Sequence, residues 1–227
     1  MSFAAGSIPF GLLLARAKGV DLRATGSGNI GATNVGRALG RKWGVAVYFL
    51  DAAKGALPVL LAGWLSGALG ANPAHLPASV QWWWLAVAIC AVLGHMYTPL
   101  AGFKGGKGVA TGSGALMAIY PVLTLPVLVA VAMWMMCLFA LRIMSVAGMV
   151  AGVTVPAALV TMAVLHRPQG SPPMDALQPI MPSLVVSVLV AVLVIWKHRS
   201  NIARIRAGTE PRVGLGFLSA GRNHKNR

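Results

Sequence analysis

Long apolar stretches alternate with short polar ones along the whole chain. The longest apolar stretches cover residues 45–65, 78–97, 109–141, 144–165 and 180–196, and they carry almost no charge. A helix needs about 20 apolar residues to cross a bilayer. The pattern therefore predicts an all-α, polytopic integral membrane protein.

Two apolar stretches do not have the length of one crossing. Residues 3–15 fall short of the ~30 Å hydrocarbon layer at ~1.5 Å per helical residue, which predicts a truncated first helix or half of one. Residues 109–141 correspond to ~50 Å as a single helix, and Pro121 and Pro126 favour a break within them. Two crossings in that stretch bring the expected total to about seven.

The charged residues orient these crossings. Only 10% of the chain is charged, and 19 Lys and Arg outnumber 4 Asp and Glu. Cytoplasmic loops of membrane proteins collect Lys and Arg. With seven crossings, all basic residues except Arg167 and the intramembrane Lys54 fall on one side, which predicts an external N-terminus and a cytoplasmic C-terminus. We expect a membrane-embedded domain over residues 1–212 and a cytoplasmic tail over 213–227.

Composition excludes several other classes of protein. The net charge of +15 would indicate nucleic-acid binding in a soluble protein. Here basic membrane loops account for it, and no aromatic and basic recognition motif is present, so no nucleic-acid partner is expected. With so few acids and no metal-ligand spacing, we expect neither a metal nor another cofactor. Cys90 and Cys137 lie inside apolar stretches, where they are expected to pack.

The first polar loop reads GSGNIGATNVGRALG over residues 26–40. Its glycines let successive backbone N–H groups point into one concavity, which is how a chain can bind an anion. Short polar side chains add donors, and an arginine adds a charge that pairs well with phosphate. A flexible linker is the alternative. The candidate phosphate-binding residues are Gly26, Ser27, Gly28, Asn29, Thr33, Asn34 and Arg37.

A second loop, FKGGKGVAT over residues 103–111, interleaves glycines and lysines directly before an apolar helix. Free N–H groups at a helix N-terminus and nearby lysines favour an anion. The loop is not a nucleotide-binding P-loop, because Lys107 is followed by Gly108 and not by Ser or Thr. Ordinary positive-inside lysines next to a turn are the alternative.

The third polar stretch, HRSNIARIRAGTE over residues 198–210, follows the last apolar segment. His198, Asn201 and either Arg204 or Ile205 share one helix face at three- and four-residue spacing. A basic helix that lies on anionic lipid is the alternative. Glu210 is expected to pair with a basic neighbour. All three polar stretches reach the predicted cytoplasmic surface, and this convergence indicates a functional site.

Two charged residues fall inside or near an apolar stretch. Asp51 and Lys54 are three apart on a helix and are expected to form a structural ion pair, because isolated charges in a membrane are costly. His95 follows Gly94 at the inner end of its crossing. Two roles stay open for it, binding of substrate or a hydrogen bond to a loop carbonyl.

Together and in this order, these motifs resemble those of the bacterial acyl-phosphate:glycerol-3-phosphate acyltransferases, the PlsY family. Members usually have a full first helix, whereas only five residues precede Gly6 here. The matching segments are spread over most of the chain: GSIPFG (6–11), DLRATGSGNIGATNVGRALG (21–40), DAAKG (51–55), GH (94–95), FKGGKGVAT (103–111) and HRSNIARIRAGTE (198–210).

The resemblance implies a seven-helix enzyme of the bacterial inner membrane whose site faces the cytoplasm. It implies transfer of a fatty acyl group from acyl phosphate to the sn-1 hydroxyl of glycerol 3-phosphate, which gives lysophosphatidic acid and phosphate in the first step of phospholipid biosynthesis. It implies no metal and no acyl-CoA or acyl carrier protein as direct donor. Membrane lipids and a functional link to the enzyme that makes acyl phosphate complete the expected partners.

By matching motif positions, the resemblance also implies roles for individual residues. We expect direct attack by the glycerol hydroxyl, with either His198 or a substrate phosphate oxygen taking the proton. Ser27→Ala and Lys104→Ala are expected to lose turnover. Besides the first-loop residues named above as phosphate-binding, the assignments are catalytic for Ser27, Lys104, His198 and Asn201, substrate-binding for Gly105, Gly106, Lys107, Gly108 and Thr111, and structural for Asp51, Lys54 and Glu210.

Two other functions stay open as alternatives. A transporter or flippase of a phosphorylated solute or lipid would be expected to show internal repeats and broken helices at mid-membrane, and no repeat is visible in the sequence. A scaffold that recruits anionic lipid accounts for the basic C-terminal stretch but not for the order of the two glycine-rich loops.

Overall fold

The computed structural model describes residues 1–214, and every regular element within that range is a helix. The prediction of an all-α membrane protein with several crossings is confirmed. Residues 215–227, most of the predicted tail, lie outside the described range. Five described segments are long and apolar enough to cross a membrane, and they are built on α4 (Arg41–Leu65), α5 (Ala78–Met96), α7 (Thr124–Leu141), α8 (Met144–Leu165) and α10 (Met181–Lys197).

The first apolar segment consists of two short helices, α1 (Ser2–Gly6) and α2 (Phe10–Ala17). Pro9 directly precedes α2, and a proline cannot donate the backbone hydrogen bond that a continuous helix needs. The expected single helix, truncated or halved, is therefore replaced by two helices separated at residues 7–9.

The long stretch over residues 109–141 also forms two helices, as its length predicted. α6 (Val109–Met117) ends before Pro121, and α7 begins at Thr124. Pro126 does not interrupt α7, because it lies in the first turn, where a helix tolerates proline. The connection between the two helices meets the loop after α4, where Gly70 N–H donates to Tyr120 O at 3.0 Å.

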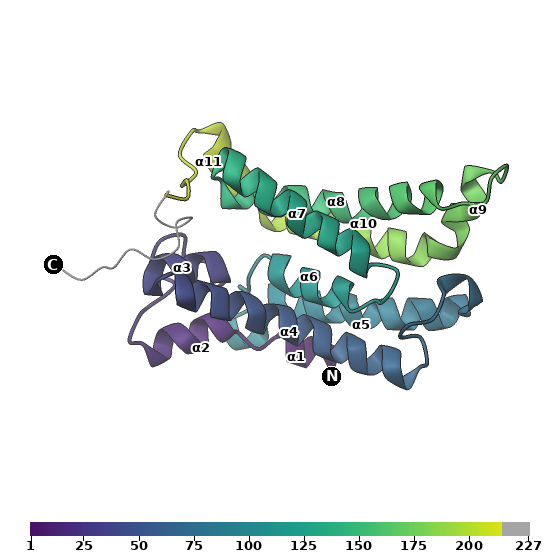
Figure 1. Ribbon diagram of the computed structural model, residues 1–227. Helices are drawn as coiled ribbons and strands as arrows, with labels where there is room; N and C mark the ends of the chain where they lie inside the picture. The colour runs from purple at the N-terminus through teal and green to yellow at the C-terminus, as the bar shows by residue number, and fades with distance from the viewer. Residues whose placement is uncertain (215–227) are drawn as a thin grey trace.

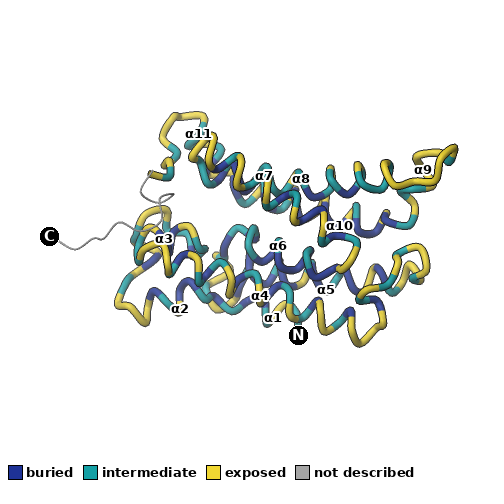
Figure 2. The backbone as a smooth tube through the Cα atoms, in the orientation of Figure 1, coloured by how far each residue is buried: buried dark blue, intermediate teal, exposed yellow. Residues whose placement is uncertain are grey.

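The helices form two layers that run along the length of the molecule (Figure 1). One layer contains α1 to α6, and the other contains α7, α8 and α10. Buried apolar side chains join the layers, among them Leu85 of α5, Leu116 of α6 and Val190 of α10. Figure 2 shows the buried backbone concentrated on the inner faces of the helices, as a shared core requires.

Helices α4 and α6 approach each other through reciprocal glycines. A Cβ at Gly55 of α4 would lie 2.3 Å from Thr111 O of α6, and a Cβ at Gly114 of α6 would lie 2.0 Å from Ala52 O of α4. No side chain fits at either position without movement of the backbone. The absence of side chains at these two glycines therefore sets how closely α6 lies against α4.

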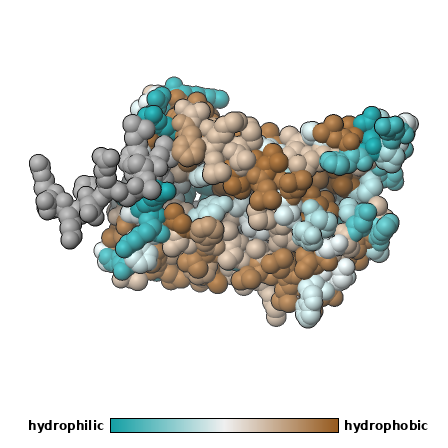
Figure 3. All heavy atoms as spheres, in the orientation of Figure 1, coloured by the Kyte–Doolittle hydropathy of each residue, from teal (hydrophilic) through white to brown (hydrophobic). Residues whose placement is uncertain are grey.

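Hydrophilic residues gather at the two ends of the molecule, and the sides between them are hydrophobic (Figure 3). One end carries α3 (Ala32–Leu39) and α11 (Arg199–Arg206), and the opposite end carries α9 (Pro173–Leu177) (Figure 1). This arrangement suits a protein whose sides contact lipid and whose ends contact water. Three short 3-10 helices complete the described elements: η1 (Pro73–His75), η2 (Pro99–Ala101) and η3 (Gln178–Ile180).

Candidate active site

A polar cavity of about 120 Å³ is lined by residues from all three polar stretches of the sequence. Side chains from α4, α5, α7 and α8 complete its wall. The structure thus brings to one place segments that lie far apart in the chain. The predicted site residues that line this cavity are Ser27, Asn29, Thr33, Asn34, Arg37, Asp51, Lys107, Gly108, His198, Asn201 and Glu210.

Asn34 organises the first polar loop. Its side-chain oxygen accepts from Ser27 N–H at 3.0 Å, and its amide nitrogen donates to Leu22 O at 3.2 Å and to Thr25 O at 3.0 Å. A Cβ at Gly26, where φ is +57°, would lie 2.5 Å from that same side-chain oxygen. The amide of Asn34 therefore holds the loop backbone, and the Ser27 side chain is exposed.

Lys107 is the lysine of the second loop that reaches the cavity, where its Nζ donates to Asn201 Oδ1 at 2.5 Å. The two glycines before it are close-packing residues that do not line the cavity. A Cβ at Gly105 would lie 2.0 Å from His95 O, and one at Gly106 would lie 2.1 Å from His95 Nε2. Their lack of side chains lets the loop lie directly against α5.

Glu210 connects the C-terminal stretch to the rest of the site. Its Oε1 accepts from Asn201 Nδ2 at 2.5 Å and from Ser145 Oγ at 2.7 Å, and its Oε2 pairs with Arg204 Nε at 2.7 Å. The expected pairing of Glu210 with a basic neighbour is therefore confirmed. Because Asn201 also accepts from Lys107, one chain of contacts links α8, α11 and the second loop.

The surroundings of this cluster set the protonation of its charged groups. Burial lowers the pKa of Lys107 to about 8; the Glu210 carboxylate opposes this shift, and Arg204 and Arg37 add to it. Burial on its own raises the pKa of Glu210, but the hydrogen bonds from its three partners outweigh this effect and keep the pKa below its ordinary value. The cavity therefore contains a carboxylate and a lysine that begins to lose its proton just above neutral pH.

His198 stands between α10 and α11 and is almost fully buried. Its Nδ1 lies 2.8 Å from Val194 O, and a carbonyl only accepts, so this nitrogen carries the proton. Burial, together with the nearby Lys107 cation, lowers the pKa of the imidazole to about 4. The ring is therefore neutral near pH 7, and its Nε2, which faces Gly148, is free to accept a hydrogen bond.

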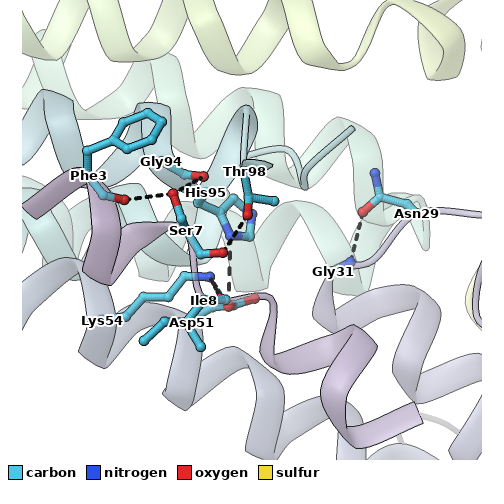
Figure 4. A network of polar contacts seen from close by, with 10 residues as sticks. All are labelled: Phe3, Ser7, Ile8, Asn29, Gly31, Asp51, Lys54, Gly94, His95 and Thr98. Atoms are coloured by element: carbon cyan, nitrogen blue, oxygen red, sulfur yellow. Dashed lines mark hydrogen bonds and ion pairs between the residues drawn. The ribbon is translucent and has the colours of Figure 1, made fainter. Parts of the chain in front are cut away.

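A buried ion pair lies next to the cavity, and Figure 4 shows its two side chains, Asp51 and Lys54. Lys54 Nζ is 2.7 Å from Asp51 Oδ1, so the predicted pair is formed, and His95 Nδ1 is 3.8 Å from the same oxygen. Both Asp51 and His95 line the cavity. The His95 ring thus lies between the Asp51 carboxylate and Gly106.

The same network fixes the break between α1 and α2 (Figure 4). Lys54 Nζ donates to Ile8 O at 2.6 Å, and Thr98 Oγ1 donates to Ser7 O at 2.6 Å. Carbonyl groups at the end of a helix lack partners within that helix, so these donors satisfy them from outside. The first segment is thereby tied to α4 and to the residues between α5 and η2.

Lys104, predicted to be catalytic, is exposed and does not line the cavity. Its carbonyl oxygen accepts from Arg23 Nη2 at 2.6 Å, which joins the second loop to the first. Thr111, predicted to bind substrate, is fully buried within α6. The predicted site residues that the structure places outside the cavity lining are Gly26, Gly28, Lys54, Lys104, Gly105, Gly106 and Thr111.

The motifs did not single out Ser145, Tyr48 or Ser113. Ser145 lines the cavity and donates to Glu210, and Tyr48 Oη lies 3.3 Å from Ser113 Oγ at the edge of the cavity. Ser145 could have been identified from its position, because it is a polar residue at the predicted cytoplasmic end of a crossing. Tyr48 and Ser113 are isolated polar residues within apolar segments, and no short motif marks them.

An apolar groove of about 420 Å³ continues directly from the polar cavity. Thr33, Tyr48, Trp134 and Gly148 line both. The groove runs between α4 and α6 on one side and α7, α8 and α10 on the other. On α4 and α7 its rim consists of large hydrophobic side chains that are exposed on the flank of the molecule: Val45, Phe49, Met135 and Phe139.

A charged cavity that opens into an apolar groove on the flank of a membrane protein defines a class: an integral membrane protein built to hold a molecule with an anionic head and an apolar chain. Residues 1–208 match the family model described as glycerol-3-phosphate acyltransferase. The chain belongs to the glycerol-3-phosphate acyltransferase family.

Individual relatives agree with this assignment over nearly their whole length. The glycerol-3-phosphate acyltransferase of Geobacter sulfurreducens is 44% identical over 212 residues, which cover 93% of this chain and 94% of the relative. That of Thermus thermophilus is 41% identical over 219 residues, which cover 94% and 92%. The family and the acyltransferase activity expected from the motifs are therefore confirmed.

Two solved structures share the fold. The crystal structure of PlsY, an integral membrane glycerol 3-phosphate acyltransferase, in its glycerol 3-phosphate form has a TM-score of 0.77 at 37% identity and covers 96% of this chain and 94% of that one. The lysophosphatidic acid form of PlsY has a TM-score of 0.75 at 36% identity over the same shares of both chains.

Proposed function

We propose that the protein transfers a fatty acyl group from acyl phosphate to the sn-1 hydroxyl of glycerol 3-phosphate, as the first acylation of phospholipid synthesis in the bacterial inner membrane. The observation that carries this proposal is the junction between the polar cavity and the apolar groove. A donor with a phosphate head and a fatty chain occupies both at once. The donor comes from a partner enzyme that makes acyl phosphate.

The charges of the cavity are suited to holding two phosphate groups close together. Arg37 and Lys107 supply positive charge, and Ser27 with the backbone N–H groups of its loop supplies neutral donors. Lys107 takes the role that motif matching gave to Lys104, because only Lys107 lines the cavity. The exposed Lys104 attracts anionic substrates toward the site from solution.

The apolar groove holds the acyl chain. Each methylene kept out of water contributes ~0.8 kcal/mol, in the groove as in lipid. The exposed rim residues of α4 and α7 let the chain enter sideways from the inner leaflet. The donor carbonyl then lies where cavity and groove meet, near Gly148 and the imidazole of His198.

The reaction needs little chemistry from the protein, since the mixed anhydride of the donor is already activated. The glycerol hydroxyl oxygen attacks the carbonyl carbon, the bond from that carbon to the phosphate oxygen breaks, and phosphate leaves with the electron pair. His198 Nε2 accepts a hydrogen bond from the attacking hydroxyl and orients it. With a pKa of about 4 the imidazole is a weak base, so a substrate phosphate oxygen takes the proton. Positioning and charge stabilisation supply most of the acceleration.

The proposal places the cavity at the cytoplasmic end of seven crossings, with the N-terminus outside and the C-terminus inside. The five long segments account for five of them, and the broken α1–α2 segment for another. The seventh is α6, which covers only ~14 Å. The loop before it carries its lysines on the basic, cytoplasmic side.

The test measures phosphate release from acyl phosphate by the purified protein in detergent, with labelled glycerol 3-phosphate as acceptor. Release that forms labelled lysophosphatidic acid without added metal or acyl-CoA supports the proposal. A protein that instead moves glycerol 3-phosphate across vesicle membranes without acylating it contradicts the proposal and favours a transporter.

Variants in the same assay locate the site. Ser27→Ala and Lys107→Ala are each expected to lower kcat/KM roughly 100-fold or more, the loss typical when one donor to a developing charge is removed. Lys104→Ala is expected to cost much less. Thermal unfolding in detergent checks that the variants are folded. Equal losses for Lys104→Ala and Lys107→Ala would contradict the assignment of the cavity as the phosphate site.

A further inference from the structure

The apolar groove is open along its side, and on four helices its lining ends far from the polar cavity. The last lining residue on each of these helices forms what we call the end stop: Leu116 of α6, Val127 of α7, Val155 of α8 and Ser187 of α10. Each has 6% or less of its surface exposed. The rim of the groove differs, because Phe49 and Phe139 are 64% and 60% exposed.

The end stop lies at the same depth on all four helices. Two helical turns, about 10 Å, separate each of its members from a groove residue at the level of the polar cavity. These cavity-level residues are Val109 on α6, Trp134 on α7, Gly148 on α8 and Val194 on α10, the partner of His198. The same spacing on four helices indicates that the groove lining ends about 10 Å from the level of the cavity.

Small residues keep the space between these two levels open. A Cβ at Gly152 of α8 would meet nothing closer than 3.7 Å, and one at Gly112 of α6 nothing closer than 3.5 Å. These glycines differ from Gly55 and Gly114, where a Cβ would collide with the backbone of the facing helix. Close helix packing does not require a glycine at position 112 or 152. The missing side chains of Gly112 and Gly152 instead leave space in the groove.

We propose that the end stop sets an upper limit on the length of acyl chain that the enzyme accepts, and that Gly112 and Gly152 keep the path to it clear. The inference rests on the proposed function, because it assigns the acyl chain to the groove. A chain that just reaches the end stop lies fully inside. A longer chain collides with these side chains.

Discrimination at the end stop comes from exclusion. Lipid is as apolar as the groove, so added methylenes gain little before the stop is reached. A methylene that would extend beyond the end stop does not fit, and such a misfit in an apolar pocket lowers kcat/KM roughly tenfold or more. The profile of kcat/KM against chain length is therefore expected to be flat for short chains and to fall steeply past one length.

Val155→Ala removes part of the end stop. The assay measures kcat/KM for a series of saturated acyl phosphates that differ by two carbons, with one detergent throughout. For each enzyme, kcat/KM for the first chain beyond the limit of the unmodified enzyme is divided by kcat/KM for the longest chain within that limit. This ratio is expected to be roughly tenfold higher in the variant. The matched control is Val153→Ala on the same helix, since Val153 is 51% exposed and faces away from this groove. The control is expected to keep the original profile.

Gly152→Leu makes the opposite change, because its side chain fills the groove before the end stop. The limit is expected to move to shorter chains, with turnover of short chains retained. Partial unfolding lowers all rates together and cannot shift the limit in opposite directions in two variants. Unchanged limits in both active variants would overturn the end stop and leave the proposed function intact. Absence of turnover by the unmodified enzyme with every chain length would overturn the proposed function, and the end stop with it.

Discussion

The protonation of Lys107 connects the packing of one loop to the pH range in which the site can bind phosphate. Gly105 and Gly106 have no side chains, so the loop lies against His95 of α5. This position buries Lys107, and burial lowers its pKa to about 8. Its ammonium is the charge that a phosphate needs, and the neutral amine lacks it.

The pH dependence of kcat/KM is expected to follow this titration. Above a pKa of about 8 the cation fraction falls, so kcat/KM for glycerol 3-phosphate should decline by roughly tenfold per pH unit. Lys107→Arg should move the decline to higher pH, because arginine keeps its charge throughout this range. Initial rates with each enzyme over pH 7 to about 10, corrected for uncatalysed hydrolysis of the donor, measure the shift.

The matched control is Lys104→Arg, in the same loop but outside the cavity. It is expected to keep the original alkaline decline. If Lys104→Arg moved the alkaline decline to higher pH and Lys107→Arg did not, the charge that binds phosphate would belong to Lys104.

For single residues, the sequence predicted which residue types form the site better than which side chains point into the cavity. The motif FKGGKGVAT identified both lysines, but glycines allow backbone angles that no pattern specifies, such as φ of +82° at Gly108. Which lysine turns inward therefore depends on how the loop meets α5. Asn34, predicted to bind substrate, lines the cavity and also bonds to the backbone of its own loop. The sequence did not show this second contact, because a polar side chain in a loop bonds to its own backbone as readily as to a ligand.

Among the helices, the contact between α4 and α6 decides where the second loop ends. Gly55 and Gly114 let the two backbones touch, and α6 begins at Val109, directly after Lys107 and Gly108. A shift of α6 away from α4 therefore moves the lysine as well. The packing of this short helix is part of the geometry of the site.

Gly114→Ala is expected to destabilise the protein by about 1–3 kcal/mol, the typical cost of overpacking, because the new Cβ meets Ala52 O at 2.0 Å. Gly152→Ala is the matched control, since its Cβ meets nothing closer than 3.7 Å. Alanine also favours a helix over glycine by about 1 kcal/mol, so the control should be as stable as the original or more so. Thermal unfolding in one detergent compares the three proteins. An equal or higher midpoint for Gly114→Ala would contradict the close approach of α4 and α6.

The helices themselves were largely predictable, because apolar length and proline are local signals. The expected span over 144–165 matches α8 residue for residue. The split of residues 109–141 was predicted from length and from Pro121 and Pro126, of which Pro126 lies inside α7. The break at Pro9 was missed, since the first segment was judged by its length alone. Its partners, Lys54 and Thr98, lie on distant parts of the chain, and the sequence does not show that they meet it.

On the scale of the whole molecule, all polar machinery described above lies toward one end, and the proposed orientation makes that end cytoplasmic. Residues near α11 and residues near η1 should therefore differ in access from the two sides of the membrane. The two native cysteines, Cys90 and Cys137, can be replaced by alanine to give a background for labelling.

In that background, Arg206→Cys is expected to react with a membrane-impermeant maleimide only from the cytoplasmic side, and His75→Cys only from outside. Intact cells and inverted vesicles give the two measurements. Labelling of both positions from the same side would contradict the proposed number of crossings. Turnover by each single-cysteine protein serves as the control for correct folding.

The global arrangement was predictable because charge and hydropathy act over whole segments and do not depend on contacts. The convergence of three polar stretches on one face followed from counting crossings and basic residues. The shape of the apolar groove could not be predicted from the sequence, since it depends on which side of each helix faces inward. Residues of the end stop, such as Val155 and Ser187, belong to different helices, and only the packing of these helices places them at one depth.

The break between α1 and α2 has a consequence for how the protein enters the membrane. The carbonyl groups of Ser7 and Ile8 find their donors on Thr98 and Lys54, which the ribosome delivers much later. Unpaired carbonyl groups are poorly tolerated in lipid. The opening segment therefore has no stable place of its own during synthesis, and it settles only when the chain as far as residue 98 has been inserted beside it.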